Sequence, residues 1–217
     1  SKMCPEIDRC VVSTDSPQIA EIAVRYGADV PGLRPPALAG DDTPLWHALR
    51  HALLQAEDST GVRYEYLLLL DPTSPAREPS DVSQAFRRLR QTPSATGIVG
   101  VSRPSFNPLW VCVVERDGWM TDIHEYGARF QSRQKVPPVY RINGSLYIWR
   151  AEFARKHKRA WRQGGKYLMY EIPELRAMSI DSAEDFELSE MLVTHGKIKF
   201  PWLTPKSRVR RRAKDAV

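Results

Sequence analysis

Segments typical of strands and of helices alternate along the first half of the chain, and this alternation restricts the fold more than any other feature. Short β-branched or apolar runs predict strands at residues 9–14, 65–70 and 96–103. Amphipathic patterns predict helices between and after them, at residues 16–27, 43–58 and 80–91. Strands that alternate with helices of about 10–15 residues form βαβ units. The sequence therefore predicts an α/β fold with a mostly parallel sheet that helices cover on both faces.

The first of these helices has clear boundary signals. Ser16 is the expected N-cap, Pro17 occupies the first helical position, and Gly27 is the expected stop signal. The apolar residues fall at helical spacing and are expected to form one buried stripe, made of Ile19, Ile22, Ala23 and Tyr26.

The strand at 65–70 ends in a loop with unusual chemistry. Asp71 follows the strand directly, and "PTSPAR" supplies the hydroxyls of Thr73 and Ser74 and the guanidinium of Arg77. In open α/β sheets, ligands bind outside the carboxyl ends of the strands. Hydroxyl and guanidinium groups bind sugars and phosphates. We therefore expect this loop to bind substrate, although a plain strand-to-helix connection would use similar residues.

Three other polar segments are expected at the same edge. "STDS" (13–16) precedes a helix N-terminus, which favours anions. "RQKVPPVYRINGS" (133–145) offers Arg133 and Arg141 as forks for carboxylate or phosphate, with Asn143-Gly144 as a tight turn. "SIDSAED" (179–185) offers Asp181 as a ligand for a divalent cation. Each segment also has a reading without chemistry: a helix cap, a hairpin turn and the start of the last helix.

The middle of the chain departs from the strand–helix alternation. Residues 110–150 predict strands around a turn at Asp117-Gly118, then a polar stretch and a further strand, "SLYIW". We expect subunit contact at this excursion. A basic helix is expected at 151–167, followed by a strand and a closing helix after Asp181.

Bulk composition excludes several classes of protein. The 217 residues suit one domain, and no apolar run approaches the length of a membrane helix. The tail 204–217 has six basic residues and one acidic residue, so it carries +5 of the net charge of +6. We expect a disordered tail on a nearly neutral, cytoplasmic protein; nucleic-acid binding through 206–214 is the weaker alternative.

His47 and His51 share a helix face, but no further ligand pattern accompanies them.

The order of several segments resembles the acylneuraminate cytidylyltransferases, which include the CMP-sialic acid synthetases. The matching strings run over residues 7–190: "VVSTDS" with "IA" and "YGA" after it, "LLLLDPTSPAR", "SFNPLW", "RQKVPPVYRINGSLYI" and "IDSAEDFELSE". The resemblance implies a three-layer, Rossmann-like nucleotidyltransferase in which residues 1–203 form the catalytic domain. It also implies a dimerisation arm at about 115–142 and a homodimer.

The resemblance implies transfer of CMP from CTP to the anomeric hydroxyl of a nine-carbon 2-keto acid sugar, with Mg²⁺ as cofactor. On this basis Asp181 would bind Mg²⁺, and Arg133 would reach the sugar carboxylate across the dimer interface. The residues expected to bind substrate are Thr73, Ser74, Arg77, Gln134, Arg141, Asn143 and Gly144.

Two departures from the family pattern leave an alternative open. The N-terminal "A-R-x-G-S-K-G" loop, which cradles the triphosphate, is absent, and we expect the sequence to be N-terminally incomplete. Ser179 stands where the family's "D-I-D" metal motif has its first Asp, which predicts weaker Mg²⁺ binding. The alternative is a non-catalytic dimeric homologue that has lost nucleotide binding.

Overall fold

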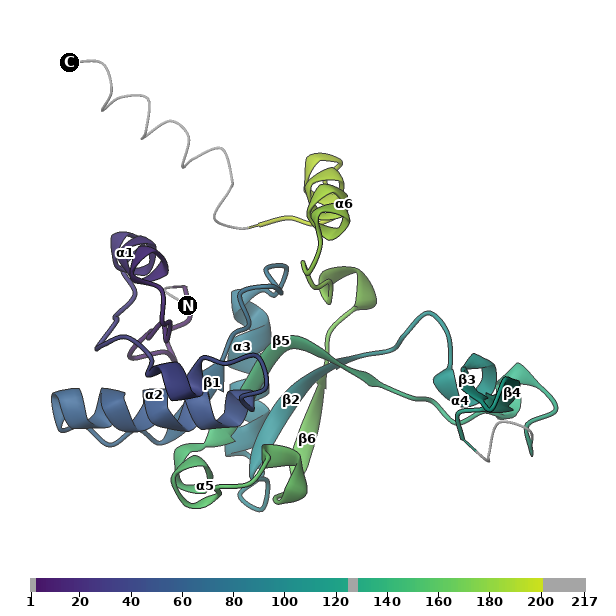
Figure 1. The fold of residues 1–217 in the computed structure, drawn as a ribbon, viewed down its shortest axis with the longest axis horizontal. Coiled ribbons are helices and arrows are strands. Elements are labelled where there is room, and N and C mark those ends of the chain that lie inside the picture. The colour runs from purple at the N-terminus through teal and green to yellow at the C-terminus, as the bar shows by residue number, and fades with distance from the viewer. Residues whose placement is uncertain (1–2, 125–128, 201–217) are drawn as a thin grey trace. The chain divides into compact units, whose positions relative to one another are not determined.

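The computed structural model describes residues 3–124 and 129–200, so the predicted tail at 204–217 lies outside the described residues. The chain forms two compact units, each built from three separate stretches. Figure 1 labels the helices and strands along the chain. Of the described residues, the first unit contains those up to Leu70 together with Glu78–Val99 and Leu146–Tyr170, and the second contains Asp71–Arg77, those between Gly100 and Ser145, and those from Glu171 onward.

A four-stranded sheet with the order β1-β5-β2-β6 is the central element of the fold. Its strands are β1 (Tyr66–Leu69), β2 (Gly97–Ser102), β5 (Arg141–Arg150) and β6 (Tyr167–Glu171). β1 pairs antiparallel with β5, with Tyr66 opposite Arg150 and Leu69 opposite Tyr147. The predicted α/β class is confirmed, and the antiparallel β5 makes the sheet a mixed one.

The helices of the first unit are α1 (Pro17–Arg25), α2 (Leu45–Thr60), α3 (Pro79–Arg90) and α5 (Ala151–Lys156). The predicted boundaries of α1 are confirmed, because Ser16 Oγ accepts from the N–H of Ile19 and Gly27 has a φ of +79°. The predicted buried stripe is wrong. Ile19, Ile22 and Tyr26 are 53%, 51% and 77% exposed, since no described residue covers that face of α1.

The prediction of a first strand at residues 9–14 is also wrong. Residues 9–14 make a single parallel bridge, Val11 with Asp29, and no ladder. A lone bridge satisfies too few backbone groups to continue as a strand.

An aromatic cluster forms the core of the first unit. Trp46 and Trp149 are at most 2% exposed, and their rings meet edge to face at 5.1 Å between centroids. Leu53, Ala151 and Ala154 complete the buried set. Each large side chain buried in this way contributes about 1.5–3 kcal/mol.

The second unit carries a hairpin and a C-terminal helix. β3 (Val113–Arg116) pairs antiparallel with β4 (Trp119–Asp122). The predicted turn at Asp117-Gly118 is confirmed, with φ values of 54° and 80°, as a two-residue hairpin turn requires. The remaining elements are α4 (Pro108–Val111), η3 (Arg133–Lys135), η5 (Glu174–Arg176) and α6 (Ala183–Thr194).

Two further expectations need correction. Asn143-Gly144 lies inside β5 and makes no hairpin turn, because the strand continues on both sides of it. The helix expected at 151–167 ends at Lys156, and a short 3-10 turn, η4 (Trp161–Gln163), follows. None of the helices in the described residues has both the length and the apolar character needed to cross a membrane.

Candidate functional site

The loop 71–77 is shaped by its own polar groups. Asp71 Oδ1 accepts from the N–H of Thr73 at 3.2 Å and from Thr73 Oγ1 at 3.0 Å. The N–H of Ser74 donates to the carbonyl of Asp71 at 3.2 Å. Asp71 therefore ends the strand segment and organises the turn that follows, as an Asx turn does.

Arg77 attaches this loop to β5. Its Nη1 donates to the carbonyls of Asp71 (2.7 Å), Ser74 (2.6 Å) and Ser145 (3.2 Å). Three backbone acceptors on one nitrogen make this guanidinium a brace for the loop. The sequence predicted a contact with substrate for Arg77; the structure gives its Nη1 this bracing contact, and the substrate contact stays a prediction.

β5 approaches the loop most closely at Gly144. Gly144 has a φ of +73°, and a Cβ placed there would lie 3.1 Å from Ser74 Oγ and 3.9 Å from Asp71 Oδ2. Both the left-handed backbone and the close approach favour glycine. Ser74 is 1% exposed, and its Oγ lies 3.5 Å from the carbonyl of Asn143.

Asn143 lies in a buried polar network across the strands. It is 3% exposed, and its Nδ2 donates to Ser102 Oγ at 2.8 Å. Ser102 Oγ donates to the carbonyl of Ile172 at 2.7 Å. Asn143 Oδ1 accepts from the N–H of Ser145 at 3.1 Å. The Asn143 amide thus holds its own strand and the end of β2 in one arrangement.

The segment before α6 meets the loop 71–77 at Thr73. The N–H of Ile180 donates to the carbonyl of Thr73 at 2.8 Å, and Ser179 Oγ donates to Thr73 Oγ1 at 3.2 Å. Asp181 follows directly and is exposed. The structure therefore brings together the loop 71–77, Asn143-Gly144 of β5 and the residues next to Asp181.

The same segment also starts α6. Ser182 is the N-cap, and its Oγ accepts from the N–H of Asp185 in a reciprocal capping box. The N–H of Asp181 and the hydroxyl of Ser182 donate to the Asp185 carboxylate and lower its pKa. Asp185 is thus occupied as a cap, whereas the carboxylate of Asp181 points to no described partner.

A magnesium ion fits Asp181 only with help from water and substrate. Within residues 3–124 and 129–200, no three His, Cys, Asp or Glu side chains come together as metal ligands. Mg²⁺ is commonly held by one or two carboxylates, several waters and substrate phosphates. An exposed single carboxylate agrees with that mode of binding.

For three residues predicted to bind substrate, the structure shows either an exposed position or a protein partner. η3 leaves Arg133 and Gln134 exposed, and in the described part of the chain neither side chain bonds to the loop 71–77. Arg141 Nε pairs with Glu174 at 2.9 Å, and its Nη2 donates to the carbonyl of Ala177. Arg141 therefore stabilises η5 in this structure, and its guanidinium group is directed at a protein carboxylate.

Sequence reasoning placed Asp71 and Ser102 at the ligand-binding edge of the sheet but gave neither side chain a specific role. Position was the available signal: Asp71 follows one strand, and Ser102 ends another. What neither position reveals is the partner of each side chain, which depends on segments far away in the sequence.

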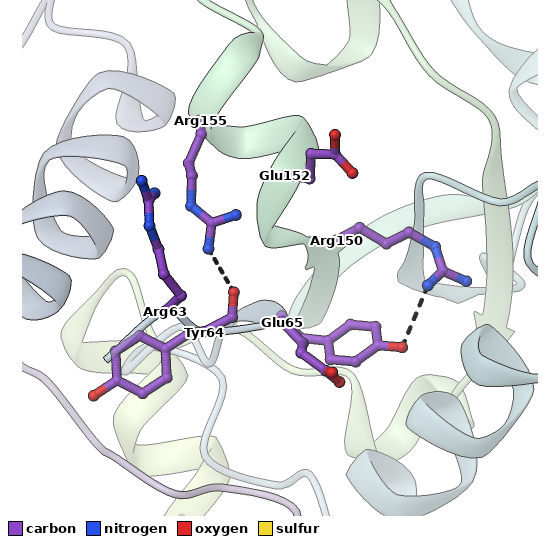
Figure 2. A pocket seen from close by; sticks show the side chains of 7 residues that line it. Arg63, Tyr64, Glu65, Arg150, Glu152 and Arg155 are labelled. Carbon is purple, nitrogen blue, oxygen red and sulfur yellow. Dashed lines mark hydrogen bonds between the residues drawn. The ribbon is translucent and has the colours of Figure 1, made fainter. Parts of the chain in front are cut away.

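A separate hollow of about 540 Å³ lies in the first unit, around the amino end of β1 (Figure 2). Arg63, Tyr64, Glu65, Tyr66, Arg150, Glu152 and Arg155 line it. Its inner arginines are engaged by the protein: Arg155 donates to Glu57 and to the carbonyl of Tyr64, and Arg150 donates to the Tyr66 hydroxyl and to backbone carbonyls. None of the predicted site residues lines this hollow, so the candidate site is the one around the loop 71–77.

Comparison with known proteins covers nearly the whole chain. The family model described as cytidylyltransferase matches residues 2–198. The CMP-N,N'-diacetyllegionaminic acid synthase of Legionella pneumophila is 34% identical over 194 residues, which are 89% of this chain and 80% of that protein. The post-translational flagellin modification protein B of Campylobacter coli is 31% identical over 184 residues, 84% and 76% of the two chains.

A solved structure shares the fold. The CMP:2-keto-3-deoxy-manno-octonic acid synthetase, in complex with CTP, matches with a TM-score of 0.62 over 90% of this chain and 84% of that chain. Its sequence is 12% identical, so this likeness shows the fold alone.

Proposed function

The chain belongs to the cytidylyltransferase family and is a nucleotidyltransferase, and from that premise we propose that it transfers CMP from CTP to a sialic acid or related nonulosonate. The observation that carries the proposal is the convergence of the loop 71–77, Asn143-Gly144 and the segment before Asp181. The named relatives support the substrate class, because one of them is a synthase for the CMP derivative of such a sugar.

In the proposed reaction the anomeric hydroxyl of the sugar attacks the α-phosphorus of CTP. A bond forms between the anomeric oxygen and phosphorus, the bond to the β-phosphate breaks, pyrophosphate leaves, and the hydroxyl proton passes to solvent. Such reactions depend mainly on positioning and on neutralising phosphate charge. Mg²⁺ held at Asp181 would supply part of the positive charge that neutralises the phosphates.

The remaining residues have positioning roles in this proposal. Thr73 and Ser74 shape the wall formed by the loop, and Arg77 braces it against β5. Asn143 and Gly144 set the backbone that faces the sugar. Arg133 would bind the sugar carboxylate, which suits a planar guanidinium.

The proposed assembly is a homodimer joined through the hairpin of β3 and β4. Trp119 and Met120 on β4 are 77% and 79% exposed, and Val113 on β3 is 48% exposed. Successive side chains point to opposite faces of a strand, so Val113 and Met120 share one face of the hairpin and Trp119 lies on the other. Large apolar side chains exposed in this way favour burial against a partner. In a dimer of this kind, Arg133 of one protomer would serve the site of its partner, which accounts for its exposed position in a single chain.

The competing proposal is a dimeric homologue without catalysis. It is favoured by Ser179, which offers no carboxylate and bonds to Thr73. The two proposals differ in whether CTP is consumed, and a direct assay separates them.

The experiment mixes the full protein with CTP, Mg²⁺ and a panel of nonulosonates, and follows pyrophosphate release and the mass of the CMP-sugar. We expect turnover with at least one sugar, and none without Mg²⁺. Replacing CTP with UTP is the control for the nucleotide. No product with any sugar, together with a dimer by light scattering, would favour the non-catalytic homologue.

A further inference from the structure

Ser102 ends β2 and has two hydrogen-bond partners in the buried polar network. It is 0% exposed. Its Oγ lies 2.7 Å from the carbonyl of Ile172 and 2.8 Å from Asn143 Nδ2. A carbonyl can only accept, so the single hydroxyl proton of Ser102 goes to Ile172, and the oxygen must accept from Asn143.

This assignment fixes which way the Asn143 amide faces. The Nδ2 end is directed at Ser102, so Oδ1 is directed at the N–H of Ser145, which it accepts at 3.1 Å. The amide therefore bridges from residue 143 to residue 145, across Gly144. Side-chain bonds of this kind to a backbone N–H two residues later stabilise unusual local backbone, and Gly144 has a φ of +73°.

The backbone held in this way contacts the loop 71–77. The position of a Cβ on Gly144 is 3.1 Å from Ser74 Oγ, and Ser74 Oγ lies 3.5 Å from the carbonyl of Asn143. The contacts thus run from Ser102 to the Asn143 amide, then to the backbone at Gly144, then to Ser74. Every side chain in this series is at most 3% exposed.

We propose that Ser102 is a positioning residue that acts through the Asn143 amide to hold the Gly144 backbone against the loop 71–77 and thereby sets sugar affinity. The kinetic part rests on the proposed function, whereas the structural part does not. Loss of the hydroxyl would leave Asn143 Nδ2 without this acceptor, and the amide would be free to rotate away from Ser145.

The kinetic experiment compares Ser102→Ala with two matched variants. Ser102→Thr keeps the hydroxyl. Ser189→Ala removes another buried hydroxyl of the second unit, one that donates to the carbonyl of Asp185 at 2.7 Å. We expect Ser102→Ala to raise the KM for sugar about tenfold, the size of one lost buried hydrogen bond. The KM for CTP should change far less, Ser102→Thr should restore most of the sugar affinity, and Ser189→Ala should leave both KM values unchanged.

Asn143→Ala tests whether Ser102 acts through the amide. In that background, Ser102→Ala should add no further rise in KM, since the residue it orients is gone. An additive effect, or a Ser102→Ala enzyme with the KM values of the wild type, would overturn the proposal.

Hydrogen exchange at the Ser145 N–H gives a readout that needs no activity. Ser102→Ala should speed exchange at this amide relative to the wild type and to Ser189→Ala. If the wild-type protein makes no CMP-sugar, the proposed function fails, and this exchange rate alone decides the structural claim. Unchanged exchange in Ser102→Ala would then contradict it.

Discussion

The hydroxyl of Ser179 donates to Thr73 Oγ1 at 3.2 Å, and this bond connects the segment before α6 to the loop 71–77. The neighbouring N–H of Ile180 donates to the carbonyl of the same threonine. Ser179 therefore has a structural partner at the position where the resemblance leads us to expect a carboxylate, and Asp181 is the exposed carboxylate that we propose as the cation ligand.

Restoring the second carboxylate should strengthen Mg²⁺ binding. We expect Ser179→Asp to lower the Mg²⁺ concentration for half-maximal activity several-fold, since a second carboxylate is a common addition to such sites. Ser179→Ala is the control, because it also loses the bond to Thr73 but gains no charge. A titration in which Ser179→Asp needs more Mg²⁺ than Ser179→Ala would show that the two positions do not share a cation.

Removing the charge of Asp181 should abolish most activity. Asp181→Asn keeps the size of the side chain, and we expect kcat to fall about 100-fold, or more, for loss of a charged group that holds the metal. Asp185→Asn is the matched control. It weakens the cap of α6, so it should lower the melting temperature and leave kcat close to the wild-type value. Similar kcat losses in both variants would point to a structural role for Asp181.

Gly144 should not tolerate a side chain. Gly144→Ala combines a positive φ with a Cβ 3.1 Å from Ser74 Oγ, whereas Gly196→Ala, at a φ of +66°, meets nothing within 4 Å. We expect Gly196→Ala to cost about 1 kcal/mol of unfolding free energy and Gly144→Ala about 2–3 kcal/mol. Chemical denaturation measures both. Equal losses would mean that the close approach at Ser74 is relieved without cost.

Arg133 is expected to act on the sugar and not on the nucleotide. Arg133→Ala should raise the KM for sugar at least tenfold while the KM for CTP changes little, because a guanidinium fork recognises the sugar carboxylate. Lys135→Ala, which removes a neighbouring exposed cation in η3, is the control. Equal effects on the two KM values would contradict the proposed contact.

The first unit should lose stability in acid through Glu57. Glu57 is 6% exposed and pairs with Arg155 at 2.6 Å; this hydrogen bond, with the N–H of Tyr64, lowers its pKa below the usual value of 4.5 despite burial. A lowered pKa means that the stabilisation is complete above about pH 4.5 and is lost as the pH falls through the folded-state value.

We therefore expect Glu57→Gln to reduce the unfolding free energy by about 2 kcal/mol at pH 7, with a smaller difference from the wild type at pH 3. Urea denaturation at both values measures it. Glu152→Gln is the control, since that carboxylate is exposed beside Lys156 and its loss should change stability little. A difference that grows in acid would mean that the ion pair with Arg155 is not the source.

Patterns of neighbouring residues in the sequence correctly predicted the strands and turns whose conformation depends on those residues alone. The strand before Asp71 and the turn at Asp117-Gly118 follow from apolar patterning and turn residues, and both are confirmed. The buried face expected on α1 is wrong, because amphipathic spacing indicates which face is apolar but not whether another segment covers it.

The sequence predicted which residue types lie at the candidate site better than it predicted the groups that each residue contacts. Asn143-Gly144 has the composition of a hairpin turn, yet its positive φ serves a close approach to Ser74 inside β5. Arg77 was expected to contact substrate, and its Nη1 bonds to three carbonyls from two segments. Such partners are set by tertiary contacts, and no local pattern encodes them.

A crystal structure with bound CMP-nonulosonate and Mg²⁺ tests the central claim most directly. We expect the sugar to contact the loop 71–77 and the backbone at Asn143-Gly144, with the cation on Asp181. A complex in which the ligand occupies the hollow lined by Arg63 and Glu152, and leaves Thr73 and Asp181 untouched, would contradict the account.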